Sequence, residues 1–205
     1  WFFMNAFDLT EDQQDCLQEL INVAMGQASD QLARYLDTFV YLKVPKIEQV
    51  KSEQLLVTLN QDLKATAVVS QGFFGYEGIR GEALLMYQPQ DSNRLADLLG
   101  YEADELTFDE QIIDLSSILT TTFLNVFASQ IDNQMSYSAP RLLSPNLGAV
   151  TQHLQQQAFN WDLALKVRIS YQVTDYSFNC DMVLLIPEQA IINIKTVIDR
   201  ILEEF

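Results

Sequence analysis

The stretch EDQQDCLQELINVAMGQASDQLARYL, at residues 11–36, decides the fold because it predicts a long helix with two distinct faces. At about 100° per residue, one side of this helix collects seven apolar residues. They are Leu17, Leu20, Ile21, Ala24, Ala28, Leu32 and Tyr35. Four further positions fall within an arc of about 60° on the other side. These are Asp15, Glu19, Asn22 and Gly26, called the polar row below, and we expect them to point away from the core.

Two members of the polar row work against the helix that carries them. Most polar faces of surface helices are simply solvated. Asn22, however, belongs to a residue type that competes for backbone hydrogen bonds, and a glycine such as Gly26 costs about 1 kcal/mol relative to alanine in a helix interior. We therefore interpret the row as a functional face. Gly26 would permit the close approach of a partner, or of another helix of this chain.

The second half of the sequence repeats the first. An offset of 95 residues relates three pairs of positions: Glu19 and Asp114, Asn22 and Ser117, Pro45 and Pro140. In both copies 22 residues separate the middle position from the proline, and an offset of 98 later relates Pro89 to Pro187. The chain is thus predicted to be an internal duplication, a single domain over residues 1–205 with halves at about 8–100 and 105–205.

Each half is predicted to contain a helix, several strands and a second helix. Thr10 with Gln13, and Thr107 with Glu110, have capping-box spacing at the start of a long helix. Shorter helices are expected at 93–99 and after Pro187. Strands are expected at 39–50, 55–59, 65–70, 82–87, 138–150, 161–173 and 178–186. The glycines at 72–81 precede an alternating segment, so they predict a hairpin connection rather than a phosphate-binding loop.

Two such halves can pair about a pseudo-two-fold axis and merge their strands into one sheet. We therefore predict an α/β (α+β) fold. It is a two-layer sandwich with a largely antiparallel sheet, in which the two long helices lie side by side and expose their polar faces.

Composition narrows the range of partners. The 12 basic and 28 acidic residues give a net charge of −16, which disfavours nucleic acid and anionic membranes and favours a partner with a basic rim. Cys16 and Cys180 are assigned to packing and His153 to the surface or a loop, so no metal site is expected. With no long apolar span and no secretory start, a cytoplasmic location is expected. Met4 has the place of a natural start, so residues 1–3 are expected to carry no function.

The order Asp15-x3-Glu19-x2-Asn22, followed after 22 residues by Pro45, resembles the signature of the CheC/CheX/FliY family. The run ELINVAMGQA at 19–28 is similar to that family's E-x-x-N-x-x-x-G-x-A pattern. The resemblance covers nearly the whole chain and is closest to the stand-alone CheC type. It implies a chemotaxis phosphatase that hydrolyses the aspartyl phosphate on a CheY-like response regulator receiver domain.

The resemblance also implies the role of each residue in the first copy. Asn22 would hold a water in line with the phosphoryl group, because a carboxamide both donates and accepts hydrogen bonds. Glu19 would pair with the receiver's active-site lysine. Asp15, Gly26 and Pro45 would support them. No cofactor of this chain is implied, because Mg²⁺ would come with the response regulator.

The second copy departs from the family's pattern. Asp114 is one methylene shorter than glutamate, Ser117 carries a hydroxyl in place of a carboxamide, and Glu110 replaces the usual aspartate or serine. Together with Pro140 these residues form a degenerate second site, inactive or rebuilt for binding. We expect one working site, at Glu19 and Asn22.

Two alternatives belong to other classes. The chain could be a non-catalytic adaptor that binds a receiver domain or a CheD-like receptor deamidase, although binding alone would not require Asn22. A purely structural duplicated domain would leave Asn22 and Gly26 exposed without a reason.

Overall fold

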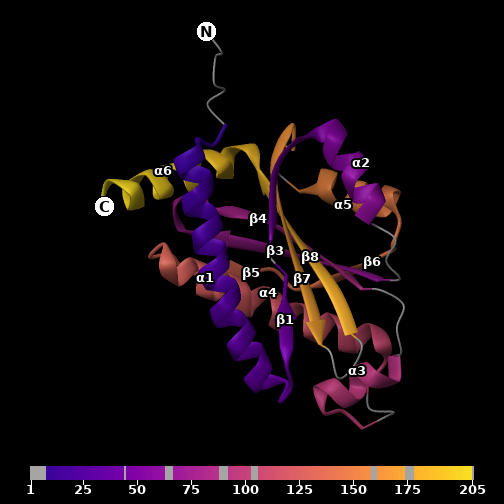
Figure 1. Cartoon of the computed structure of the whole chain (residues 1–205). Coiled ribbons are helices and arrows are strands. Elements are labelled where there is room, and N and C mark those ends of the chain that lie inside the picture. Colours follow the sequence, from indigo (N-terminus) through magenta and orange to yellow (C-terminus); the bar gives the residue numbers. More distant parts are fainter. Residues whose placement is uncertain are drawn as a thin grey trace.

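A computed structural model describes residues 8–43, 45–62, 67–87, 92–102, 106–157, 161–173 and 178–204 (Figure 1). The expectations for residues 1–3, for 65–66 and for Pro89 lie outside these ranges. The first half contains α1 (Glu11–Tyr35), β1 (Val40–Leu42), β2 (Lys46–Lys51), α2 (Ser52–Asp62), β3 (Ala67–Gly75), β4 (Arg80–Tyr87) and α3 (Ser92–Leu99). The second contains α4 (Phe108–Gln130), β5 (Met135–Tyr137), β6 (Arg141–Leu143), α5 (Leu147–Gln156), β7 (Leu163–Val173), β8 (Phe178–Pro187) and α6 (Glu188–Glu203).

The same order of elements, α-β-β-α-β-β-α, occurs twice along the chain. β5, β6 and α5 each begin 95 residues after β1, β2 and α2, and β8 begins 98 residues after β4. These are the two offsets that the proline positions predicted. The duplication is therefore present in the elements themselves and not only in the motif.

One antiparallel sheet contains all eight strands, and the two halves interlock within it. Its order is β1-β7-β8-β4-β3-β5, with β2 also beside β7 and β6 beside β3. β4 and β8 pair at the centre, so equivalent strands meet there. The short strands β1 and β2 pair with the long β7 of the other half, whereas β5 and β6 pair with β3. Each half thus completes its share of the sheet with strands from the other.

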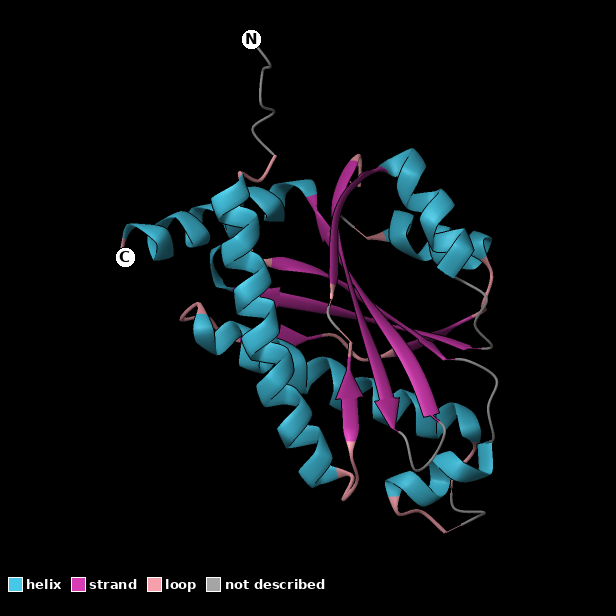
Figure 2. Ribbon diagram, in the orientation of Figure 1, coloured by secondary structure: helices cyan, strands magenta, loops and turns pink. Residues whose placement is uncertain are grey.

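The large core lies between the sheet and α1, α4 and α6, which cover one face (Figure 2). Leu17, Ile21 and Leu32 of α1 and Ile112 and Phe123 of α4 are buried there, and α1 lies beside α4. This cluster contains many more buried apolar side chains than the one on the opposite face, so at roughly 25 cal/mol per Å² of buried apolar surface it contributes the larger share of the hydrophobic stabilisation. The predicted α/β fold, with its largely antiparallel sheet and paired long helices, is confirmed.

The opposite face is covered by α2 and α5, where the sequence predicted strands, so the sheet has helices on both faces and one layer more than the predicted two-layer sandwich. Residues 55–59 form part of α2, in which Leu55 and Leu59 are buried and Val57 is 57% exposed, a four-residue spacing that belongs to a helix. The region 138–150 contains the short β6 and then α5, which begins where the Asn146 side chain accepts the Ala149 amide at 2.9 Å. The strand predicted at 55–59 was wrong, and the strand predicted at 138–150 is present only as the short β6, because short apolar runs suit either element.

Two predictions for single residues were also wrong. Tyr35 is 66% exposed, because the last buried contact at this end of α1 is made by Leu36. His153 is buried in α5, where its Nε2 lies 2.9 Å from the Ser70 hydroxyl and 2.8 Å from a Glu82 carboxylate oxygen. The same ring nitrogen contacts both partners, so this cluster lacks the relay geometry of a catalytic triad. It satisfies polar groups beneath α5.

Among the described helices, Phe108–Gln130 alone passes a length-and-composition test for a membrane span. In the protein 56% of that window is buried, as expected of a helix that packs on a sheet.

Candidate functional site

The helix that carries the polar row is anchored firmly at its start. The Thr10 hydroxyl accepts the Gln13 amide at 3.2 Å, and the Gln13 side chain accepts the Thr10 amide at 2.9 Å. Gln13 Nε2 also donates to Asp199 of α6 at 2.7 Å. The predicted capping box is therefore present, and it ties α1 to a second helix.

All four members of the polar row are exposed on one side of α1. The opposite side packs into the core through Leu17, Ile21, Ala24, Ala28 and Leu32. The orientation predicted from helical periodicity is confirmed, and the roles of the residues remain predictions. The row is a surface that a second protein can reach.

The Asn22 amide is held by a neighbour that occupies none of the motif positions. Gln18, one turn earlier on α1, donates its Nε2 to Asn22 Oδ1 at 3.1 Å. The i,i+4 spacing of Gln18 and Asn22 was the feature of the sequence that could have indicated this hydrogen bond. The hydrogen bond uses one acceptor position of Asn22, and the residue remains exposed.

The space above Gly26 is open. A Cβ placed on this residue would meet nothing within 4 Å. Within the described ranges no other helix packs there, so the helix-packing alternative for Gly26 is wrong. A partner's loop can approach the backbone at this point, one turn beyond Asn22.

Pro45 lies apart from the row. It is buried immediately before β2, at the break between β1 and β2, where its missing N–H cannot pair in a sheet. Pro140 immediately precedes β6 in the same way. Both prolines therefore belong to the edges of the sheet, and α1 alone brings Asp15, Glu19 and Asn22 together.

The thiols are poorly suited to chemistry. Burial raises the pKa of Cys16 and, more strongly, that of Cys180, so both remain protonated at neutral pH. In the part of the chain that the structure describes, no group of three His, Cys, Asp or Glu residues is placed to hold a metal ion.

Comparison with known proteins links the fold to flagellar and chemotaxis proteins. No protein-family model and no curated protein matches the sequence. Among solved structures, FliY of Thermotoga maritima matches with a TM-score of 0.64 and 16% identity, over 94% of this chain and 98% of that one. The FliM middle domain from H. pylori matches with a TM-score of 0.65 and 14% identity, over 92% and 99%. CheX from Desulfovibrio desulfuricans matches at 0.50 and 9%, over 82% and 99%. This chain has the CheC/FliM-like fold.

The two long helices differ at the positions of the polar row. The row on α4, called the second row below, consists of Glu110, Asp114, Ser117 and Thr121, which the 95-residue offset relates to Asp15, Glu19, Asn22 and Gly26. The 95-residue offset places the buried Leu17, Ile21 and Leu32 on Ile112, Ser116 and Phe127, which are buried too. The same offset leaves Asp114 exposed but Ser117 only half-exposed, and it puts Thr121 where α1 has Gly26. Thr121 donates its hydroxyl to the Ser117 carbonyl at 2.7 Å. The second row therefore has no open position one turn beyond its serine.

The acidic residues of the second row are engaged within the chain. α4 begins later than the offset predicts, so Glu110 falls in its capping box and accepts the Thr107 amide at 2.8 Å. This hydrogen bond lowers the pKa of Glu110. Asp114 accepts the Tyr101 hydroxyl at 3.1 Å. In the second half of the chain, the Glu110 carboxylate therefore caps α4 and the Asp114 carboxylate bonds to Tyr101.

Proposed function

We propose that the chain is a phosphatase for the aspartyl phosphate of a CheY-like receiver domain, in chemotaxis or related two-component signalling. A cytoplasmic setting follows from that substrate. The observation that carries the proposal is the exposed row on α1, in which Glu19, Asn22 and the open Gly26 lie on one accessible face. The motif resemblance supports it, and the fold is compatible with it.

Asn22 would act by positioning a water. An aspartyl phosphate is already labile, so a helper gains most by placing the nucleophile in line with the departing carboxylate. The carboxamide can orient a water without removing its proton. Gln18 would be a positioning residue, because its hydrogen bond restricts the Asn22 side chain before the receiver arrives.

Glu19 would set the register between the two proteins. Its exposed carboxylate can pair with a lysine beside the phosphorylated aspartate, and that pair loses water when the proteins dock. Mg²⁺ bound by the receiver would neutralise charge on the phosphoryl group. Asp15, one turn earlier, would add to the negative field around the pair.

One site would do the chemistry. Ser117 is partly buried and lacks amide donors, while Glu110 and Asp114 already have partners in the chain. The second row would then stabilise the folded chain and take no part in the hydrolysis of the phosphate.

The direct test follows the decay of a phosphorylated receiver domain from the same genome, with and without the purified chain. We expect Asn22→Ala to lower the single-turnover rate by about a hundredfold while the complex still forms. The matched variant Ser117→Ala should stay within about twofold of the parent. An Asn22→Ala protein with the parental rate would refute the catalytic proposal.

A non-catalytic adaptor is the second candidate. FliM from H. pylori, which has this fold, has been solved in a complex with FliG. A chain that binds a receiver domain or a CheD-like deamidase without accelerating phosphate loss would support this alternative.

A further inference from the structure

A groove runs beside the polar row, between α1 and the last turn of α6. Its floor is formed by Cys16 and Leu20 of α1 and by Ile201 and Leu202 of α6. Leu202 is 38% exposed, one of the large apolar side chains that the fold leaves open to solvent. The buried residues of α6, such as Ile194 and Ile198, pack on the sheet. The floor therefore extends the apolar face of α6 beyond the core.

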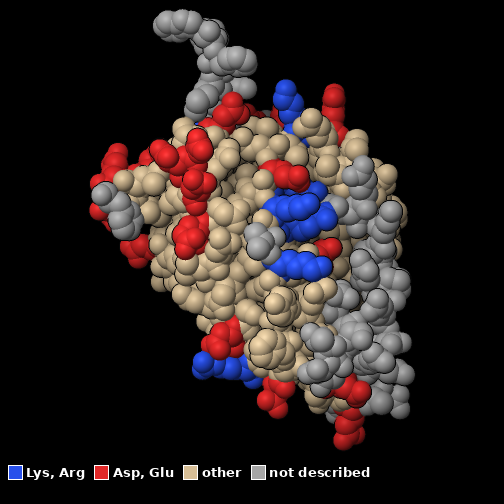
Figure 3. All heavy atoms as spheres, viewed as in Figure 1, with Lys and Arg blue, Asp and Glu red and all other residues tan. Residues whose placement is uncertain are grey.

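Carboxylates line the rim of this groove on both sides. Asp12, Asp15 and Glu19 lie on α1, and Glu204 lies directly after the end of α6. Figure 3 shows acidic side chains over α1 and over the end of α6, with uncharged surface between them. None of these four carboxylates forms an ion pair within the described ranges.

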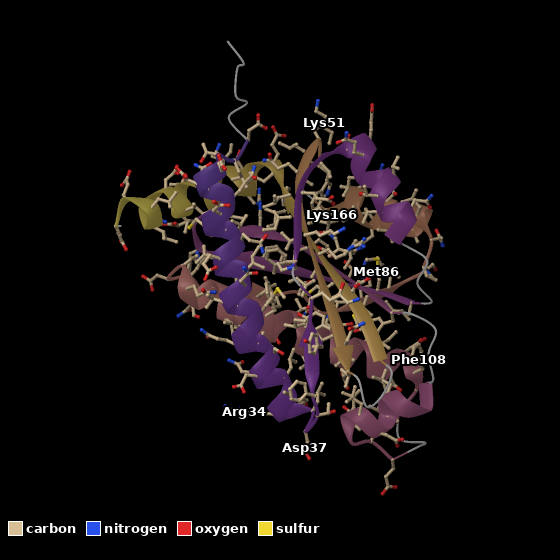
Figure 4. The ribbon with its side chains drawn as sticks, viewed as in Figure 1. Arg34, Asp37, Lys51, Met86, Phe108 and Lys166 are labelled. Atoms are coloured by element: carbon tan, nitrogen blue, oxygen red, sulfur yellow. The ribbon has the colours of Figure 1, made fainter. Side chains whose placement is uncertain are left out.

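The basic residues of α6 and α1 interact with groups outside the groove. Arg200 of α6 pairs with Glu77, and Lys195 donates to the Asp8 carbonyl. Arg34, which is labelled in Figure 4, lies at the far end of α1. It pairs with Asp30 at 2.9 Å. The groove thus keeps an uncompensated negative rim, which favours a cationic occupant.

The walls of the groove are held in place before any partner arrives. Gln130, the last residue of α4, donates its Nε2 to the Leu20 carbonyl at 2.8 Å. Gln13 joins α1 to Asp199 of α6. A groove fixed by two such links loses little entropy on binding.

We propose that the groove is a second docking contact for the receiver domain, through an amphipathic segment whose apolar side chains cover the floor and whose Lys or Arg side chains face the rim. This inference rests on the proposed function, because Glu19 belongs both to the rim and to the site. Apolar anchors ringed by complementary charge are the usual form of a protein docking surface. The contact contributes to affinity and association rate, while the chemistry stays with Asn22.

The test separates docking from chemistry. Leu202→Ala and the double variant Asp12→Asn/Glu204→Gln alter the groove without touching Glu19 or Asn22. We expect each to raise the half-saturating receiver concentration about fivefold or more, with the maximal single-turnover rate within twofold. The acidic double variant should also reduce the salt dependence of binding. Val57→Ala, an exposed apolar residue on α2 across the sheet, is the matched control and should change nothing.

Direct binding to a beryllofluoride-activated receiver domain keeps the two proposals distinguishable. If the parent protein dephosphorylates the receiver and the groove variants bind it as tightly as the parent does, the docking proposal alone is overturned. If the parent protein binds the receiver without dephosphorylating it, the phosphatase proposal alone is overturned. In that case a weaker affinity of Leu202→Ala supports the docking proposal, and an unchanged affinity overturns it. Absence of binding to any receiver from the same genome would overturn both. A parental dimer that Leu202→Ala dissociates would mean that a second copy occupies the groove, against the proposal.

Discussion

Replacing Gly26 with alanine should make the protein more stable and less able to bind its partner. Gly26 lies inside α1, and positive φ values among the described glycines occur only at Gly78 and Gly100, so alanine fits the backbone there. Because the added Cβ meets nothing within 4 Å, the change should gain the helix-propensity difference of about 0.5–1 kcal/mol. For a chain of this size that corresponds to a rise of roughly 1–4 °C in Tm.

The functional effect should have the opposite sign. If a receiver loop approaches the backbone above Gly26, a methyl group there must push it away. We expect at least a threefold loss of affinity, and a larger loss for Gly26→Leu. Tm is measured by thermal denaturation and affinity by titration of an activated receiver domain. Gln31→Ala, at an exposed position on the same helix, is the control and should leave affinity unchanged.

Two results would refute this reasoning. An unchanged or lower Tm for Gly26→Ala would mean that the position is not open. A more stable Gly26→Ala protein that binds and dephosphorylates like the parent would mean that the glycine serves no partner, and the solvated-face interpretation would replace ours.

Three further predictions follow from other parts of the molecule. Glu19→Gln should weaken receiver binding about tenfold or more, because it leaves the partner's lysine unpaired on docking; titration with an activated receiver domain measures this, and equal affinity would contradict the role. Glu110 has a lowered pKa in the folded protein, so its stabilising contribution is present above the unfolded pKa and is lost as the pH falls through the folded value. Glu110→Gln should therefore flatten the dependence of Tm on pH below about 4.5, with the parent as control. Leu59→Ala should cost about 2–5 kcal/mol, because this fully buried side chain belongs to the apolar cluster that α2 and α5 form with the sheet. At a permissive temperature it should leave dephosphorylation unchanged, and a loss of rate would show that the far face matters to the site.

Much of the candidate site could be predicted because it lies on one helix. The spacing of Asp15, Glu19, Asn22 and Gly26 places them on one side of α1 whatever the rest of the chain does. Gln18 was not predicted, although it lies four residues before Asn22. It contributes a local hydrogen bond and does not occupy a position of the motif. The groove could not be predicted, since Leu20 and Leu202 come together only when α6 packs beside α1.

The sequence by itself determined the long helices, their polar faces and the hairpin at 72–81, because these depend on neighbours a few residues apart. It also determined the duplication, which follows from a repeated spacing. The tertiary structure alone decided that β1 and β2 pair with β7 of the other half and that residues 55–59 form a helix. It also buried His153 against Glu82. Short apolar runs have no fixed preference of their own, so the sheet face that they must cover selects their conformation. Charge pairing across elements likewise depends on distances that only the folded chain establishes.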